Sequence, residues 1–166
     1  MGIATRRSRK VDAMARIFVF HLKEGDVFAF NIDASVGINS PNRRVDVELV
    51  QFGYFALSRN PKANPTVKAF AKDVMPGAPY SGVDNDPLTL AIQEHQIQRG
   101  GTRDGHVSPV TGSSGMYSTI DGPHTFQLLV LVNNMRDLLG RDFPRIDKHE
   151  RCPQALRDAV AACFDT

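Results

Sequence analysis

Apolar residues near the start of the chain follow a strand-like pattern. Residues 16–33 ("RIFVFHLKEGDVFAFNID") hold two runs rich in Phe, Val and Ile that flank Lys23-Glu24-Gly25-Asp26, and this arrangement predicts a β-hairpin. Alternation predicts one shared apolar face made of Phe18, Phe20, Leu22, Phe28, Phe30 and Ile32. Because an isolated two-stranded hairpin is marginal in water, that face must be covered, either by the chain's own helices or by a partner.

The next apolar segment has a helical pattern. Residues 45–59 ("VDVELVQFGYFALSR") are apolar nearly all round a helix, which predicts a central buried helix, with Asp46 as its N-cap. Residues 60–85 are rich in proline and glycine and leave room for one short helix, over 66–75.

A third helix is predicted over residues 87–99. Asp86 suits its N-cap, Pro87 suits its first position, and Gly100-Gly101 ends it. Four residues of this segment share one helical face: Leu88, Ala91, Ile92 and His95. A lone histidine on such a face is usually a satisfied core or rim residue.

The rest of the chain predicts a turn, a loop and two more helices. Asp104-Gly105 forms the centre of a turn, and residues 111–123 are predicted as a surface loop rich in Gly and Ser. Residues 124–139 predict a buried helix, and a last helix begins at Pro153. The fold class is therefore mainly α, a small helical bundle with an N-terminal β-hairpin.

Composition narrows the class of protein. Of the 166 residues 42% are hydrophobic, enough for one globular domain over 15–166, and the net charge is +2. This balance argues against a strongly basic nucleic-acid binder. Residues 1–14 predict a flexible basic arm, either solvated or in contact with an acidic partner.

Two further features concern the protein's location. No apolar run is long enough to span a membrane, and the N-terminus lacks the pattern of a secretory signal. We therefore expect synthesis in the cytoplasm, with any delivery to the periplasm or cell wall by an assembly or injection route. Cys152 and Cys163 are too far apart on a helix to pair with each other.

Catalytic and metal-binding patterns are weak. No two of the five histidines have the spacing that places two metal ligands on one face. Asp84, Asp104 and His106 are the best candidates for acid–base chemistry, but Asp84 suits a turn and Asp104 suits the Asp-Gly turn. We expect no enzymatic activity, no metal and no cofactor.

Residues 36–110 resemble the peptidoglycan-binding-like domain family. The family signature has a V-D-G turn, a Thr, A-I-x-x-F-Q on a helix, a Gly, and a second D-G turn followed by G-P or a similar dipeptide. The matching residues here are Val83, Asp84, Thr89, Ala91, Ile92, Gln96, Gly101, Asp104, Gly105, Val107 and Pro109. The family's first helix, D-V-x-x-L-Q-x-x-L, is similar to "DVELVQFGYF", which supplies Asp46, Val47, Val50, Gln51 and Phe55.

The chain departs from the signature at several positions. Asn85 stands where the family has glycine, and Asn is the next best residue for a left-handed turn. His95 stands where the family has an aromatic residue, and the segment between the first helix and the V-D turn is long. The hairpin over 15–35 and the helical extension over 111–166 are additions.

The resemblance implies a three-helix domain that binds cell-wall glycan or stem peptide without catalysis. The expected ligand-binding residues are Gln96, Arg103, Asp104 and His106, beside the helix and the Asp-Gly turn. A free-standing binder of this kind would belong to a phage particle, a lysis system or a secretion apparatus. The alternative is a structural or assembly protein that forms a homo-oligomer or binds a partner through its Phe-rich hairpin.

Overall fold

The computed structural model describes residues 16–22, 25–112, 115–120 and 122–165, with the backbone alone at 18–22, 25–27 and 118–119. The predicted arm over 1–14 lies outside the described residues. The α-helices are α1 (Arg44–Arg59), α2 (Pro65–Ala71), α3 (Pro87–Gln98), α4 (Gln127–Leu139) and α5 (Gln154–Ala162). The strands are β1 (Arg16–Leu22), β2 (Gly25–Asn31), β3 (Val36–Gly37), β4 (His106–Val107), β5 (Met116–Thr119) and β6 (Gly122–Thr125). Short 3₁₀ helices span Gly140–Asp142 and Ile146–Lys148. The mainly helical class predicted from the sequence is confirmed.

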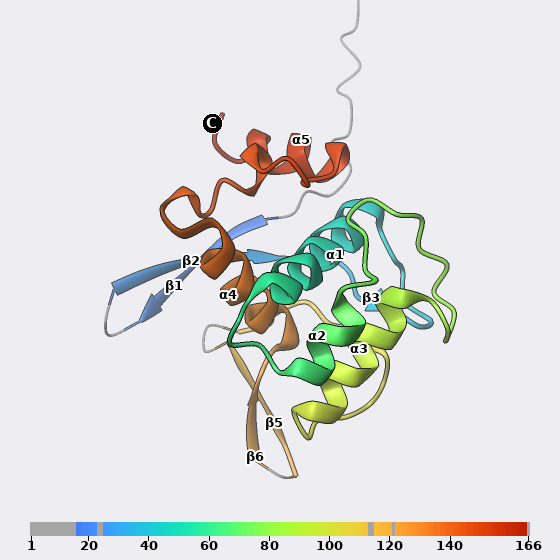
Figure 1. Ribbon diagram of the computed structural model, residues 1–166. Coiled ribbons are helices and arrows are strands. Elements are labelled where there is room, and N and C mark those ends of the chain that lie inside the picture. The colour runs from blue at the N-terminus through green and yellow to red at the C-terminus, as the bar shows by residue number, and fades with distance from the viewer. Residues whose placement is uncertain (1–15, 23–24, 113–114, 121, 166) are drawn as a thin grey trace, which may run out of the picture.

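Helix α1 lies at the centre of the molecule, between α4, α5 and the α2–α3 pair (Figure 1). Residues on every side of it are buried, as the sequence predicts, and Leu49, Val50, Phe52 and Tyr54 are fully inaccessible. A Cβ at Gly53 would lie 2.8 Å from Leu131 Cβ, so the absence of a side chain there lets α4 pack closely on α1. These contacts build one apolar core that joins the helices.

The acidic residues at the start of α1 bind distant backbone groups. The expectation that Asp46 caps α1 is wrong: Arg43 is the N-cap, and Asp46 lies inside the first turn. Its buried carboxylate instead accepts hydrogen bonds from the N–H groups of Asp33 and Ala34, each at 3.1 Å. Glu48, two residues further on, accepts from the N–H of Leu156 at 2.8 Å and so caps α5 from a neighbouring helix.

Helices α2 and α3 pack side by side (Figure 1). Asp86 caps α3 as predicted, because its side chain accepts from the N–H of Leu88 at 2.9 Å, and Pro87 occupies the first turn. Leu88, Ala91, Ile92 and His95 are all buried on the predicted face. Helix α2 ends at Ala71, earlier than the predicted 66–75 segment.

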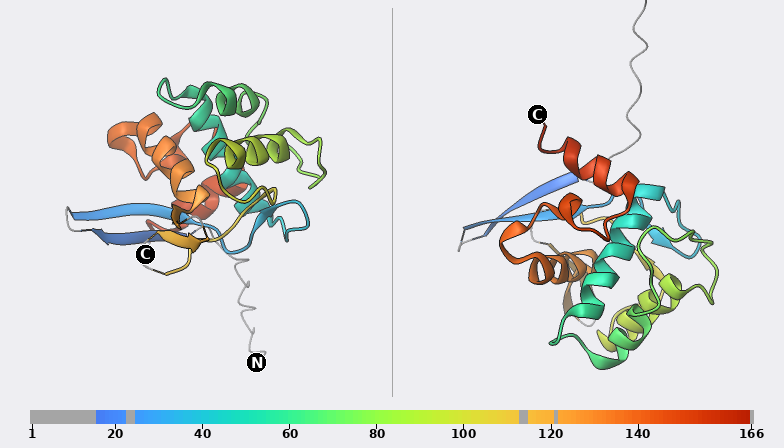
Figure 2. Two further views of the ribbon diagram at one scale, coloured as in Figure 1. Left: turned by 90° about the horizontal axis from the view of Figure 1, so that it is seen from below. Right: turned by 45° about the horizontal axis from the view of Figure 1, so that its top comes forward.

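The β1–β2 hairpin projects from the helical body (Figures 1 and 2). Leu22 pairs with Gly25, so the turn is shorter than predicted, and the register pairs Phe18 with Ala29 and Val19 with Phe28. Directly opposed residues share a face. The expectation that Phe18 and Phe20 share a face with Phe28 and Phe30 is therefore wrong, since they fall on opposite faces.

Among the hairpin residues whose side chains the structure describes, those at the end of β2 are packed on the helices. Phe30 is fully buried and meets the Phe143 ring edge-on, with 5.8 Å between ring centroids. Phe28 is 48% exposed, although its carbonyl accepts a hydrogen bond from Arg136 at 2.7 Å. At residues 29 and 30 the chain's own helices therefore cover the apolar side chains of the hairpin.

Two predictions for the C-terminal half need correction. The segment predicted as a loop over 111–123 contains β5 and, with β6, forms a second hairpin. Because β6 occupies residues 122–125, α4 begins at Gln127 and not at His124. In the described part of the chain, no helix combines the length and the apolar character needed to cross a membrane.

Candidate functional site

A short antiparallel pairing of two residues in each strand holds the Asp104-Gly105 turn against β3, the strand that precedes α1. Strand β4 pairs with β3, with Val36 opposite Val107 and Gly37 opposite His106. A Cβ at Gly37 would lie 2.2 Å from the carbonyl oxygen of Gly105, and Gly105 itself has a φ of +74°. Only glycine fits this close crossing of two backbones. The turn therefore has a defined position relative to the helices.

Gln96, at the end of α3, fixes the same turn from the other side. Its amide nitrogen donates to Asp104 Oδ1 at 2.7 Å and to the His106 carbonyl at 3.0 Å. Its amide oxygen accepts from the Gly105 N–H at 3.0 Å. The side chain is only 8% exposed, so these bonds replace water almost completely. One amide thus satisfies polar groups of three consecutive turn residues.

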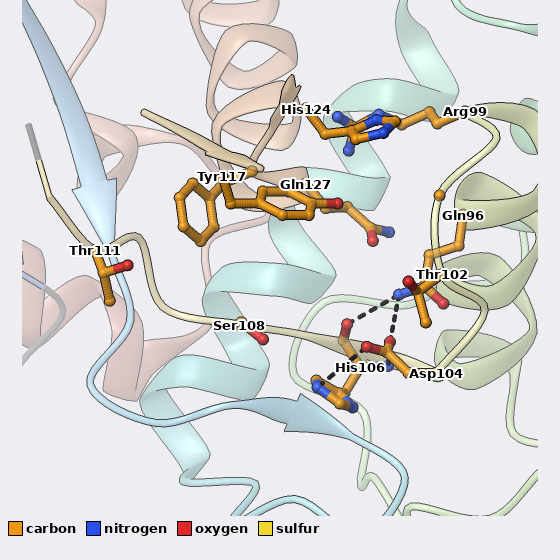
Figure 3. Close-up of a pocket in the computed structure, with 12 residues that line it drawn as sticks. Gln96, Arg99, Thr102, Asp104, His106, Ser108, Thr111, Tyr117, His124 and Gln127 are labelled. Carbon is orange, nitrogen blue, oxygen red and sulfur yellow. Dashed lines mark hydrogen bonds and ion pairs between the residues drawn. The ribbon is translucent and has the colours of Figure 1, made fainter. Parts of the chain in front are cut away.

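A pocket of about 330 Å³ opens beside this turn (Figure 3). Its wall is formed by the end of α3, the turn, the β5–β6 hairpin and the start of α4. The residues that line it are Gln96, Arg99, Gly101, Thr102, Asp104, His106, Ser108, Thr111, Tyr117, His124, Phe126 and Gln127. Hydroxyl, amide, imidazole and aromatic groups therefore face one small volume.

Three of the four predicted ligand-binding residues line this pocket. Gln96, Asp104 and His106 do so, whereas Arg103 is exposed and is absent from its lining. The Asp104 carboxylate is already engaged: Oδ1 binds Gln96 and the His106 N–H, and Oδ2 lies 3.4 Å from His106 Nε2. These residues act first as framework of the pocket.

The other acid–base candidate, Asp84, does not join this group. It is exposed in the turn before α3, as its structural interpretation requires, and it does not line the pocket. Among the residues that the structure describes, no group of three His, Cys, Asp or Glu side chains could hold a metal ion.

The sequence interpretation missed the opposite wall. Tyr117 and His124 come from paired strands β5 and β6, and their rings stack with centroids 5.7 Å apart and planes 29° apart. Tyr117 also lies against Phe126, with 5.1 Å between the ring centroids. A signal was present, because Asp121-Gly122 between short runs containing Tyr, Thr and His is a hairpin pattern. The Gly and Ser residues at 111–115 favoured the prediction of a loop instead.

His95 lies behind the pocket in a buried hydrogen-bond network. Its Nδ1 is 3.3 Å from the Tyr54 hydroxyl, and the Gln127 amide donates to that hydroxyl at 2.6 Å. The Tyr54 and His95 rings meet edge-on at 5.8 Å. Burial lowers the pKa of His95 to about 4 and raises that of Tyr54, so both are neutral at neutral pH. The histidine also lies 3.4 Å, at its Nδ1, from the amide nitrogen of Gln127, which lines the pocket.

Comparisons of the chain with protein-family models, with curated proteins and with solved structures gave no match. The resemblance to peptidoglycan-binding domains accordingly stays a prediction, supported by the residues of this chain. What the arrangement offers chemically is a polar pocket with an aromatic wall, suited to holding a small hydrophilic ligand.

Proposed function

We propose that this protein is a non-catalytic binder of bacterial cell-wall peptidoglycan, and that the pocket between α3 and the β5–β6 hairpin is its binding site. The observation that carries the proposal is the coincidence of two independent features. The signature residues Gln96 and Asp104 form one wall, and the stacked Tyr117 and His124, outside the signature, form the facing wall.

The lining suits a ligand built of sugars and amides. The C–H face of a pyranose ring packs against an aromatic ring, and its hydroxyl and acetamido groups need donors and acceptors close by. Tyr117 and Phe126 offer the rings, while the hydroxyls of Thr102, Ser108 and Thr111 offer both donors and acceptors. A volume of about 330 Å³ accommodates a fragment of the polymer and not a long strand of it.

Co-sedimentation with purified sacculi tests this proposal. The full chain should sediment with sacculi at moderate salt, and Tyr117→Ala should lower the bound fraction at least several-fold. Ile120→Ala is the matched control, because Ile120 lies next to β5, is 101% exposed and does not line the pocket. Sedimentation no greater than that of an unrelated protein would rule the function out.

A second candidate is an assembly protein that associates through the β1–β2 hairpin. The observation in its favour is Phe28, which is 48% exposed on a two-stranded sheet that projects from the body (Figure 2). Phe18 and Phe20 lie where the structure describes the backbone alone. Phe30 belongs to the core, so a polar residue there would unfold the protein rather than test an interface.

Light scattering after gel filtration distinguishes the two candidates. The assembly hypothesis expects an oligomer that Phe28→Ser dissociates and that the exposed control Ile120→Ser leaves intact. A wild-type protein that stays monomeric at high micromolar concentration would exclude self-association, while leaving wall binding unaffected.

A further inference from the structure

Arg99 places a positive charge at the pocket, and no carboxylate of the described residues pairs with it. It is the C-cap residue of α3, and its side chain is half-buried and lines the pocket. Its Nη2 donates a hydrogen bond to the Thr125 carbonyl, which orients the guanidinium toward the β5–β6 hairpin. In Figure 3 it lies toward the edge of the pocket that carries His124, and Asp104 lies toward the opposite edge.

Within the described residues, no carboxylate forms an ion pair with Arg99. The nearest pocket acid, Asp104, already binds Gln96 and His106. Burial lowers the pKa of Arg99, but a guanidinium stays protonated at any physiological pH. The α3 C-terminus and one carbonyl provide only partial negative charge. A half-buried cation with unused N–H donors is therefore left facing the pocket.

We propose that Arg99 makes the pocket selective for a ligand that carries a carboxylate, which the guanidinium binds while the stacked Tyr117 and His124 hold the adjacent ring or chain. This inference rests on the proposed function and names the part of peptidoglycan that is recognised. A planar guanidinium pairs with a carboxylate through two parallel hydrogen bonds, whereas a neutral sugar leaves it uncompensated.

Peptidoglycan offers this chemistry from two sources. The stem peptide carries free carboxylates, and a muramic acid from which the peptide has been removed carries a lactyl carboxylate. Both would present one anionic group beside amide and hydroxyl groups. The pocket lining alone suits either, so the two sources are separated by the ligands chosen for titration.

Isothermal titration of the full chain with defined ligands tests the proposal. The probes are a stem tetrapeptide, N-acetylmuramic acid, and N-acetylglucosamine, which lacks a carboxylate. At least one of the two acids should bind, and the neutral sugar should bind roughly ten- to hundredfold more weakly. Arg99→Gln should remove this preference, and Arg99→Lys should restore part of it. Arg141→Gln is the control, because Arg141 is exposed and lies outside the pocket.

A second readout separates failure of the inference from failure of the proposed function. The Nε–H signal of Arg99 in an ¹⁵N correlation spectrum should move with the acids and stay in place with N-acetylglucosamine. Sacculi bound equally by wild type and Arg99→Gln, with no such movement, would overturn the carboxylate site alone. Movement of the signal without any binding to sacculi would keep the carboxylate site and reject the wall-binding function.

Discussion

Two buried glutamines hold two loops in the same way, but only one of the loops borders the pocket. Gln51 of α1 accepts a hydrogen bond from the Gly77 N–H and donates one to the Ala78 carbonyl, both at 2.9 Å. Gln96 of α3 does the same for the Asp104-Gly105 turn. Each glutamine side chain is less than 10% exposed.

The surroundings of the two loops differ. One hollow beside the loop held by Gln51 is mostly apolar, with Val74, Met75 and Pro79 in its lining. A second hollow, of about 330 Å³, holds Arg44 and Glu48, whose charges already pair with each other. The turn held by Gln96 faces Arg99 and Tyr117 across the pocket. The shared amide contact is therefore framework, and the contacts that would distinguish a ligand under the proposed function come from the β5–β6 hairpin, which lies outside residues 36–110.

Replacing each glutamine by leucine should give the largest loss of stability. The two variants should differ in their binding to sacculi. Gln96→Leu leaves the Gly105 N–H and the His106 carbonyl without partners, and Gln51→Leu does the same to Gly77 and Ala78. Each should lower the free energy of unfolding by about 2–3 kcal/mol. Urea denaturation would measure this as a lower midpoint with an unchanged slope. Only Gln96→Leu should also weaken binding to sacculi, and an equal loss of binding in both variants would contradict a site beside α3 alone.

The two glutamines also differ in the residue that precedes them. It is the fully buried Val50 in α1 and His95 in α3. The pKa of His95 is about 4 in the folded protein, below the ordinary 6.5 expected after unfolding. Between these values the unfolded chain binds the proton and the folded protein does not. The stability contributed by neutral His95 is thus complete above pH 6.5 and is lost as the pH falls toward 4, by about 3 kcal/mol at most.

His95→Phe should remove this part of the acid sensitivity. Phenylalanine keeps an aromatic ring against Tyr54, and the Gln127 amide still binds the Tyr54 hydroxyl. Unfolding free energies measured by urea at pH 7, 5.5 and 4.5 should therefore fall less steeply in the variant than in the wild type. Acidic residues titrate in both proteins, so the difference between the two slopes isolates the histidine. Identical slopes would show that folding does not lower the pKa of His95.

The framework could be predicted from the sequence because it depends on local rules. Asp86-Pro87 marks the start of α3, apolar spacing marks its buried face, and Gly105 marks the turn. Asp46 shows the limit of such rules: it has the right residue type for a cap, yet its partners lie at residues 33 and 34, which only the tertiary fold brings near.

The rest of the site could not be predicted because long-range packing determines it. Strand β5 is four residues long and follows a Gly- and Ser-rich stretch, so its strand character is weak in the sequence. Nothing in the sequence near Arg99 indicates that Tyr117 and His124 will face it. The predicted apolar face of the β1–β2 hairpin failed for a different reason. That face requires an odd number of residues in the loop after Leu22, and the observed pairing of Leu22 with Gly25 leaves two.

Replacement of Arg103 should have the smallest effect. The family resemblance predicts this residue as a ligand contact, but its position outside the pocket does not support that role. It sits one residue before Asp104, is exposed and does not line the pocket. Arg103→Gln should change the unfolding free energy by less than about 0.5 kcal/mol and leave binding to sacculi within about twofold. If it weakens binding as much as Arg99→Gln, the ligand must cover the outer side of the turn, where Ile38 and Asn39 line a second hollow with His106. The ligand would then contact the turn held by Gln96 directly. The two glutamine-held loops would differ in ligand binding because of their own residues, and not because of the β5–β6 hairpin.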